Sequence, residues 1–276
     1  MLSSTPNEAV IRTRPLQLGI GLKMYFDLPR TREWAEQVRA LAQSHPAIAQ
    51  GIVDLWVLPT TVALESVASI LAGSPVAIGA QDLAVSDAGA FTGETSGVTL
   101  AQLGCRFVEV GHAERRSLFQ EDEDIVRAKM TAAVRNNLIP VLCVGEASEG
   151  SPADAAAECV RLLQSAVADL DEPADVIVAY EPVWAIGAAQ PASAQHIEVV
   201  TAALRKACDA DARLGAASII YGGSAGRGQF AALPQTVDGL FVGRGAHDVE
   251  DLRVILDDIA ARAGSISETT AQGSAT

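Results

Sequence analysis

The sequence predicts an α/β protein in which eight strand–helix units close into a single-domain (β/α)8 barrel. Short apolar runs alternate with longer amphipathic stretches, as expected of a parallel sheet whose strands are joined by helices. Eight units in about 250 residues match the size of this barrel. An open, doubly wound sheet is the alternative. It usually carries a Gly-x-Gly-x-x-Gly fingerprint after its first strand, and the residues around Gly19 and Gly21 do not supply one.

Eight apolar runs are predicted as the strands of this sheet. They cover residues 16–22, 54–58, 76–80, 107–110, 139–144, 176–180, 218–221 and 239–242. The sixth run is rich in branched apolar side chains, which is typical of a strand buried on both faces of a parallel sheet.

Five stretches between these runs are predicted as helices. They cover residues 31–44, 121–136, 153–170, 195–209 and 249–261. In the first, Trp34, Val38 and Leu41 share one face, and the second begins with acidic residues that suit a helix N-terminus. The intervals after the second, third and seventh strands are ambiguous.

The barrel domain is expected to cover residues 16–263. Residues 1–15 are predicted to form a flexible N-terminal segment, and residues 264–276, rich in Ser, Thr, Ala and Gly, a flexible C-terminal tail. The start of the chain lacks the order of a signal peptide, and no stretch is apolar enough to span a membrane. The four Cys contain no Cys-x-x-Cys pair, which favours free thiols in a reducing cytoplasm and argues against a metal site.

The net charge of −14 makes nucleic acids and anionic membranes poor partners. An anionic small molecule would need a local positive site within this negative field. Lys23 is a candidate for that site because it follows an apolar strand instead of lying on a charged helix face.

Glu181 follows the sixth predicted strand, in the sequence Ala-Tyr-Glu-Pro-Val-Trp-Ala-Ile-Gly of residues 179–187. Pro182 biases Glu181 toward an extended backbone. A carboxylate beneath an apolar loop that ends in Gly can act as a general base kept from water. The pattern alone equally allows a structural Glu paired with an Arg.

Polar residues gather where several predicted strands end, which is where a (β/α)8 barrel carries its active site. Lys23, His112 and Glu181 follow the first, fourth and sixth strands, and the Gly-rich turns 222–224 and 243–245 follow the last two. Bare backbone in such turns lets N–H groups surround an anion, and their position after the last two strands favours phosphate. Gly187 is a further donor if its loop closes.

His112 precedes a predicted helical turn. A helix N-terminus disfavours the imidazolium ion, so His112 is expected to stay neutral and donate a hydrogen bond. Glu114 could then hold Lys23 or polarise the site. The alternative is that Glu114, Arg115 and Arg116 form surface or interface ion pairs, and this interpretation is favoured for Arg115. In the long loop after the third strand, Phe91 suggests docking into another subunit.

Together these segments resemble the triosephosphate isomerase family over about residues 16–260. The matching stretches are Leu-Lys-Met at 22–24, Gly-Ala-Gln at 79–81, Gly-Ala-Phe-Thr-Gly-Glu at 89–94, Val-Gly-His-Ala-Glu-Arg-Arg at 110–116, Cys-Val-Gly-Glu at 143–146, residues 179–187 and Tyr-Gly-Gly-Ser at 221–224. The resemblance implies a TIM barrel that interconverts glyceraldehyde 3-phosphate and dihydroxyacetone phosphate through an enediolate, without a metal or organic cofactor.

The resemblance also implies a role for each candidate residue. Glu181 would be the base, neutral His112 the hydrogen-bond donor to the enediolate, and Lys23, near Glu114, the balancing positive charge. Backbone N–H groups would bind the phosphate at Gly187, Ser224, Gly243 and Arg244. A lid would close over the substrate through Pro182, Val183, Trp184, Ala185 and Ile186. A homodimer would form through Phe91, Thr92, Glu94 and Arg115.

Four positions depart from the family pattern. Gly21 stands where Asn is usual, Ala113 where Ser is usual, Arg244 where a second Gly is usual, and Pro191 lies in an atypical lid. None of these removes the base, the histidine or the lysine, so the departures suggest altered substrate choice. They are similar to a branch that interconverts L-erythrulose 1-phosphate and D-erythrulose 4-phosphate, and Gly21 would leave room for one more hydroxylated carbon.

Two further alternatives stay open. A non-catalytic phosphate-binding barrel would keep the Gly-rich turns but would have no use for Glu181 together with His112. Other phosphate-binding barrels, such as those of tryptophan synthesis, would not explain the lid sequence.

Overall fold

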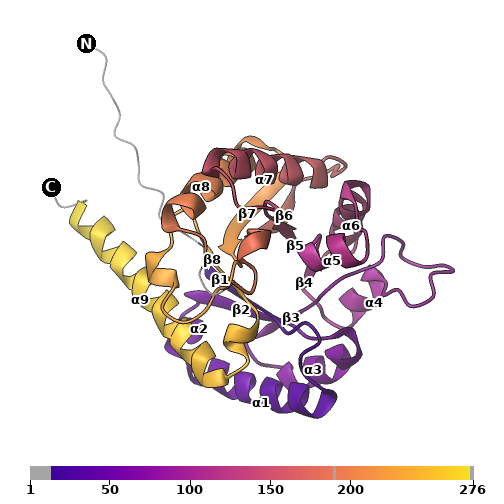
Figure 1. Ribbon diagram of the computed structural model, residues 1–276. Helices are drawn as coiled ribbons and strands as arrows, with labels where there is room; N and C mark the ends of the chain where they lie inside the picture. The colour runs from indigo at the N-terminus through magenta and orange to yellow at the C-terminus, as the bar shows by residue number, and fades with distance from the viewer. Residues whose placement is uncertain (1–13, 189–190, 274–276) are drawn as a thin grey trace.

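Eight parallel strands form a closed barrel in sequence order, with β8 paired back to β1 (Figure 1). The computed structural model describes residues 14–188 and 191–273. The strands are β1 (Leu16–Gly21), β2 (Val53–Leu58), β3 (Ala77–Ala80), β4 (Phe107–Val110), β5 (Ile139–Val144), β6 (Ala174–Tyr180), β7 (Leu214–Tyr221) and β8 (Gly239–Val242). The predicted (β/α)8 barrel is therefore confirmed, and the open sheet is not the fold.

Helices surround this barrel as an outer ring (Figure 1). They are α1 (Leu28–Ser44), α2 (Pro46–Ala49), α3 (Leu64–Leu71), α4 (Gly97–Gln102), α5 (Ala113–Leu118), α6 (Glu123–Arg135), α7 (Pro152–Ala166), α8 (Ala194–Ala210) and α9 (Val249–Gly273). Side-chain oxygens cap several helix N-termini: Asp27 accepts from the N–H of Arg30, and Asp122 accepts from that of Ile125. These caps fix where the chain leaves each loop and enters its helix.

The ambiguous intervals contain short elements. The 3₁₀ turn η1 (Thr61–Ala63) and α3 follow β2, a long loop and α4 follow β3, and η3 (Phe230–Ala232) follows β7. The turn η2 (Val183–Ala185) lies after β6, and η4 (Arg244–Ala246) lies after β8.

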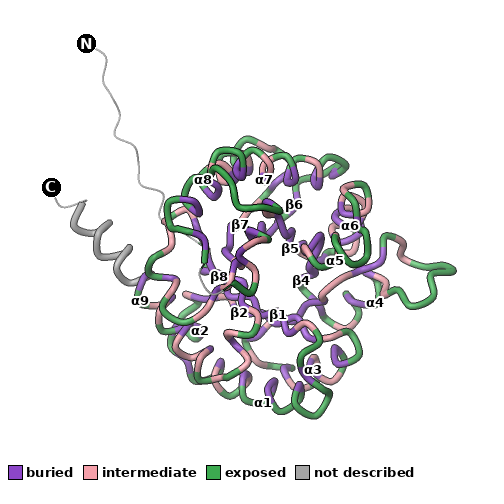
Figure 2. Tube along the Cα trace, viewed as in Figure 1, coloured by how far each residue is buried: buried purple, intermediate pink, exposed green. Residues whose placement is uncertain are grey.

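The buried side chains of the strands are divided between two hydrophobic clusters. Alternate side chains of each strand point to opposite faces, so Val141 and Cys143 of β5 and Ile177 and Ala179 of β6 belong to one cluster, in the barrel interior. The larger cluster lies between the strands and the helices, and Figure 2 shows the buried strands inside a ring of mostly exposed outer helix faces. Gly19 is required in this interior, because a Cβ there would lie 2.1 Å from the ring of Trp56.

The C-terminal helix α9 runs to Gly273, beyond residue 263, where the predicted barrel domain ends. The flexibility expected for residues 264–276 stays a prediction. Once a helix has formed, each added residue contributes a backbone hydrogen bond without a new nucleation cost, and no Pro interrupts this stretch. Residues 1–13 and 274–276 lie outside the described residues, so the predicted N-terminal segment falls mostly there.

Among the described residues, no helix is both long enough and apolar enough to cross a membrane.

Candidate active site

A cavity of about 620 Å³ opens at the carboxyl ends of the strands. It is lined by all eight residues that the sequence assigned to the reaction or to phosphate: Lys23, His112, Glu114, Glu181, Gly187, Ser224, Gly243 and Arg244. They come from both ends of the chain and meet only because the strands form a closed barrel.

Lys23 follows β1 with a positive φ of 48°, a backbone conformation that is uncommon for a residue other than Gly. The Gln81 side chain holds this turn by donating to the carbonyls of Lys23 and Leu58 at 3.0 and 2.9 Å. Lys23 Nζ donates to Glu114 Oε1 at 2.5 Å. Burial by itself lowers the pKa of Lys23, but the hydrogen bond and charge of Glu114 outweigh that effect and raise it. The cavity therefore contains a fixed ammonium ion.

Glu181 is buried at the end of β6, where its N–H donates to the carbonyl of Val144 at 2.8 Å. Its Oε2 has no hydrogen-bond partner among the described residues. Ala113, in place of the usual Ser, offers no hydroxyl to this carboxyl. Burial raises the pKa of Glu181 to about 7, with Lys23 opposing the shift. A carboxyl with that pKa can accept and return a proton near neutral pH.

Backbone glycines make room for this carboxyl. A Cβ at Gly222 would lie 2.3 Å from Glu181 Oε1, and one at Gly145 would lie 1.8 Å from the Glu181 carbonyl oxygen. No Arg among the described residues pairs with Glu181, so the structural Glu–Arg alternative does not describe it. The ionisable side chain beside it is His112, whose Nε2 lies 3.6 Å from Glu181 Oε2.

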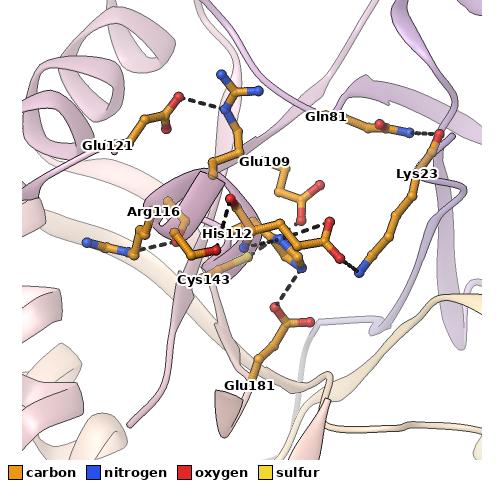
Figure 3. Close-up of polar contacts among 12 residues, drawn as sticks. Lys23, Gln81, Glu109, His112, Arg116, Glu121, Cys143 and Glu181 are labelled. Carbon is orange, nitrogen blue, oxygen red and sulfur yellow. Dashed lines mark hydrogen bonds and ion pairs between the residues drawn. The ribbon is translucent and has the colours of Figure 1, made fainter. Parts of the chain in front are cut away.

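His112 is the N-cap of α5, and its Nδ1 accepts the N–H of Glu114 at 3.1 Å. An Nδ1 that accepts carries no proton, so the neutral ring has its N–H at Nε2, on the side of Glu181. Burial, and next the charge of Lys23, lower the pKa of His112 to about 4. The imidazole is therefore neutral and points its donor into the cavity (Figure 3).

Glu109 is a cavity residue that the sequence analysis missed. It lies in β4, is buried, and accepts from the thiol of Cys143 at a distance of 3.7 Å. Burial, and next the charge of Glu181, raise its pKa to about 8. A charged residue inside the run Phe-Val-Glu-Val was the available signal, because a strand buried on both faces rarely contains an ionisable side chain.

The Gly-rich turns face the cavity from β7 and β8. Ser224 has a positive φ of 58°, and its hydroxyl donates to the carbonyl of Ala185 at 2.7 Å, which joins the turn after β7 to the loop after β6. Gly187 has a φ of 72°, and a Cβ there would lie 3.8 Å from the Arg244 guanidinium. The Arg244 side chain thus brings a second positive charge to this end of the cavity.

The predicted lid is held at its start by hydrogen bonds to a buried carboxylate, Glu146. Glu146 accepts from Tyr180 Oη at 3.2 Å and from Trp184 Nε1 at 2.7 Å, and its Oε1 lies 2.9 Å from His196 Nε2. Ala185 is buried, whereas Val183 is partly exposed. Two residues of the predicted lid, 189 and 190, lie outside the described residues.

The residues assigned to a dimer contact separate into two groups. Phe91, Thr92 and Glu94 are exposed in the loop between β3 and α4, which projects from the ring of helices (Figure 1). Arg115 instead bonds within the chain, to Glu121 at 2.6 Å and to Asp82 at 2.8 Å.

Comparisons with known proteins agree with this geometry. The family model described as triosephosphate isomerase matches residues 17–259. An L-erythrulose-1-phosphate isomerase of Pectobacterium atrosepticum is 44% identical over 249 residues, which cover 89% of this chain and 96% of that protein. A triosephosphate isomerase of Leifsonia xyli subsp. xyli is 40% identical over 75% of this chain and 83% of its own length. One of Rhodococcus jostii is 41% identical over 81% and 89%.

Proposed function

Because the chain belongs to the triosephosphate isomerase family and is an isomerase, we propose that it converts L-erythrulose 1-phosphate into D-erythrulose 4-phosphate. This substrate is dihydroxyacetone phosphate with one hydrogen of its hydroxymethyl carbon replaced by a second hydroxymethyl group. The carbonyl moves by one carbon in both cases. The same base, donor and cation therefore serve both substrates, and only the space around the extra carbon differs.

Glu181 is the proposed base. Its carboxylate removes the proton from the hydroxyl-bearing carbon beside the carbonyl, which leaves an enediolate. A proton then moves from the hydroxyl oxygen to the former carbonyl oxygen, and Glu181 returns the carbon-bound proton to the former carbonyl carbon. An unpartnered Oε2 and a pKa raised to about 7 support this role, because the free oxygen can reach the substrate and a carboxyl with that pKa can both accept and return a proton near neutral pH.

His112 and Lys23 are proposed to stabilise the enediolate. The Nε2–H of His112 faces the space beside Glu181 and can donate to the two oxygens on which charge develops. The ammonium of Lys23, held by Glu114, supplies the opposite charge.

The phosphate is proposed to bind at the other end of the cavity. Gly187, Ser224, Gly243 and Arg244 line that end, which supports their backbone N–H groups as phosphate donors, and the Arg244 side chain adds charge. Residues 182–186 are proposed to close as a lid over the substrate. Exclusion of water matters here because an exposed enediolate phosphate can eliminate its phosphate group.

The observation that favours the four-carbon substrate is the cavity floor at Gly21. A Cβ there would already lie 3.4 Å from Phe241 Cζ, so the floor is backbone and one aromatic ring where the family usually has an Asn amide. Similarity to the relative named L-erythrulose-1-phosphate isomerase supports the same choice. The three-carbon reaction is the second candidate, supported by relatives named triosephosphate isomerase at 40 and 41% identity.

A substrate panel separates the two candidates. The kcat/KM values of the purified enzyme are measured for L-erythrulose 1-phosphate, D-erythrulose 4-phosphate, glyceraldehyde 3-phosphate and dihydroxyacetone phosphate, with solvent proton exchange as a second readout. We expect the tetrulose phosphates to be preferred. Use of glyceraldehyde 3-phosphate roughly a hundredfold better than L-erythrulose 1-phosphate would contradict the proposal.

We also propose that the protein is a homodimer. Phe91 is 51% exposed on a projecting loop, which supports an interface in which a second copy of the chain covers this side chain.

A further inference from the structure

The side chain of Glu109 lies in the cavity, but the proposed chemistry does not use it. Glu181 and His112 face each other, Lys23 is held by Glu114, and the turns after β7 and β8 are assigned to phosphate. Glu109 nevertheless lines the same cavity at 7% relative exposure. A buried carboxyl that lacks good partners destabilises a fold, so its presence beside the base needs an explanation.

Glu109 lies opposite the phosphate end. In the closed order of eight strands, β4 is directly across the barrel from β8. A sugar phosphate whose phosphate lies at the turns after β7 and β8 therefore extends its carbon chain toward β4. The last carbon of a longer chain comes closest to Glu109, and Gly21 in the same cavity places no side chain in its way.

The hydrogen bonds of Glu109 leave it free to bind a ligand. Among the described residues its hydrogen-bond partner is the thiol of Cys143, a weak donor, at 3.7 Å. Burial keeps the carboxyl largely neutral at pH 7, with its pKa at about 8. A neutral carboxyl has one O–H donor and one C=O acceptor, which match the two roles of a hydroxyl group. Figure 3 shows Glu109, His112 and Lys23 converging on the same region.

We infer that Glu109 determines substrate specificity by hydrogen-bonding the terminal hydroxymethyl group of a four-carbon ketose phosphate. The inference rests on the proposed function, because a three-carbon phosphate lacks the fourth carbon and its hydroxyl. A site built to bond a hydroxyl strongly disfavours analogues without it, since its buried polar atoms are then left unpaired. Glu109 thus makes the triose phosphates poorer substrates while it leaves the proton transfer to Glu181.

The test compares two substitutions of Glu109 with a matched surface control. Glu109→Leu removes the polar atoms at similar volume, Glu109→Gln keeps a donor and an acceptor, and Glu65→Gln changes an exposed Glu on α3. The readout is the ratio of kcat/KM for L-erythrulose 1-phosphate to that for glyceraldehyde 3-phosphate. Circular dichroism and the affinity for 2-phosphoglycolate, which lacks the fourth carbon and its hydroxyl, verify folding and the phosphate end.

We expect Glu109→Leu to lower the ratio by about 10- to 100-fold, Glu109→Gln by less than about 5-fold, and Glu65→Gln not at all. A wild-type ratio that favours the tetrulose and is unchanged in Glu109→Leu would overturn the inference and leave the proposed function intact. Equal losses on both substrates would do the same, because they indicate a structural role. A wild type that prefers the triose would overturn both.

Discussion

Glu181 Oε2 lies 3.6 Å from His112 Nε2. The two residues belong to different loops, since Glu181 follows β6 and His112 follows β4. Burial acts on both in the direction that isomerisation needs. It raises the pKa of the carboxyl to about 7 and lowers that of the imidazole to about 4. The result is a base that can accept a proton and a hydrogen-bond donor that stays neutral, and burial in the same cavity causes both shifts.

Replacement of Glu181 by Gln should remove the base and keep the shape of the site. We expect kcat to fall by about three orders of magnitude or more, with little change in affinity for 2-phosphoglycolate. Steady-state kinetics and calorimetric titration measure the two quantities. Unchanged turnover would refute the assignment of the base, and unchanged affinity with lost turnover would exclude a purely phosphate-binding role for the barrel.

The activity should depend on pH through Glu181. The base works only when ionised, so kcat/KM should rise with pH up to about 7 and then level off for a triose phosphate. His112, with its pKa lowered to about 4, should not titrate in this range. A profile measured from pH 5 to 9 in constant ionic strength checks this. An activity that is flat between pH 5 and 7 would show that burial does not raise the pKa of the base.

The charged cluster beneath the projecting loop should contribute to stability. Lys129 is buried and its Nζ bonds Asp82 at 2.5 Å and Glu121 at 2.6 Å, and Arg115 contacts the same two carboxylates. Lys129→Met leaves buried carboxylates short of a partner, which costs about 3–5 kcal/mol of unfolding free energy.

Arg127 provides the control for that substitution, because its partners Asp124 and Asp169 are exposed. Arg127→Met should cost less than about 1 kcal/mol. Urea unfolding of both variants, at one protein concentration, gives the comparison. Equal losses of unfolding free energy in the two variants would mean that burial does not determine how much the Lys129 ion pairs contribute to stability.

The exposed loop makes oligomeric state a direct test of the dimer proposal. Light scattering at micromolar concentration should give a mass of twice the 28.7 kDa chain, because Phe91 would be covered by a second copy. Phe91→Asp should shift the mass toward one chain, while Val62→Asp, also exposed but on η1, should not. A monomeric wild type would contradict the proposal.

The sequence predicted the barrel well because its strands are buried on both faces and read as continuous apolar runs. The residues at the strand ends could also be predicted from the sequence, because Lys23, His112 and Glu181 are charged or polar residues that directly follow apolar runs. The start of α1 was placed at residue 31 instead of Leu28, although Asp27 and Pro29 are an N-cap and an early-helix residue.

Other features depend on contacts between residues that are far apart in the sequence. Glu109 interrupts an apolar run between Val108 and Val110, but only barrel closure places it in the same cavity as Glu181. The pairing of Glu146 with Trp184 and His196 also joins segments far apart in sequence. Such contacts between distant residues arise from topology and not from periodicity.

Glu109 should lower the stability of the fold as the pH rises. The carboxyl ionises near 4.5 when unfolded and near 8 when folded, so between these values the unfolded state releases a proton that the folded state keeps. Its contribution to stability is therefore unchanged below about pH 4.5 and falls steadily up to about pH 8. Glu181, Lys23, Cys143 and Glu114 act on this carboxyl, and of these only Lys23 favours the ionised form by its charge.

Glu109→Gln removes that titration. The stability of the variant relative to the wild type should rise by about 4 kcal/mol between pH 5 and pH 8.5, because each pKa unit of the shift corresponds to about 1.4 kcal/mol. Urea unfolding at the two pH values measures the change, and Glu65→Gln at an exposed position should show no such dependence. A stability difference between Glu109→Gln and wild type that does not grow with pH would mean that the buried carboxyl ionises without penalty. Glu109 is thus expected to lower the stability of the fold, although the proposed substrate specificity requires a carboxyl at this position.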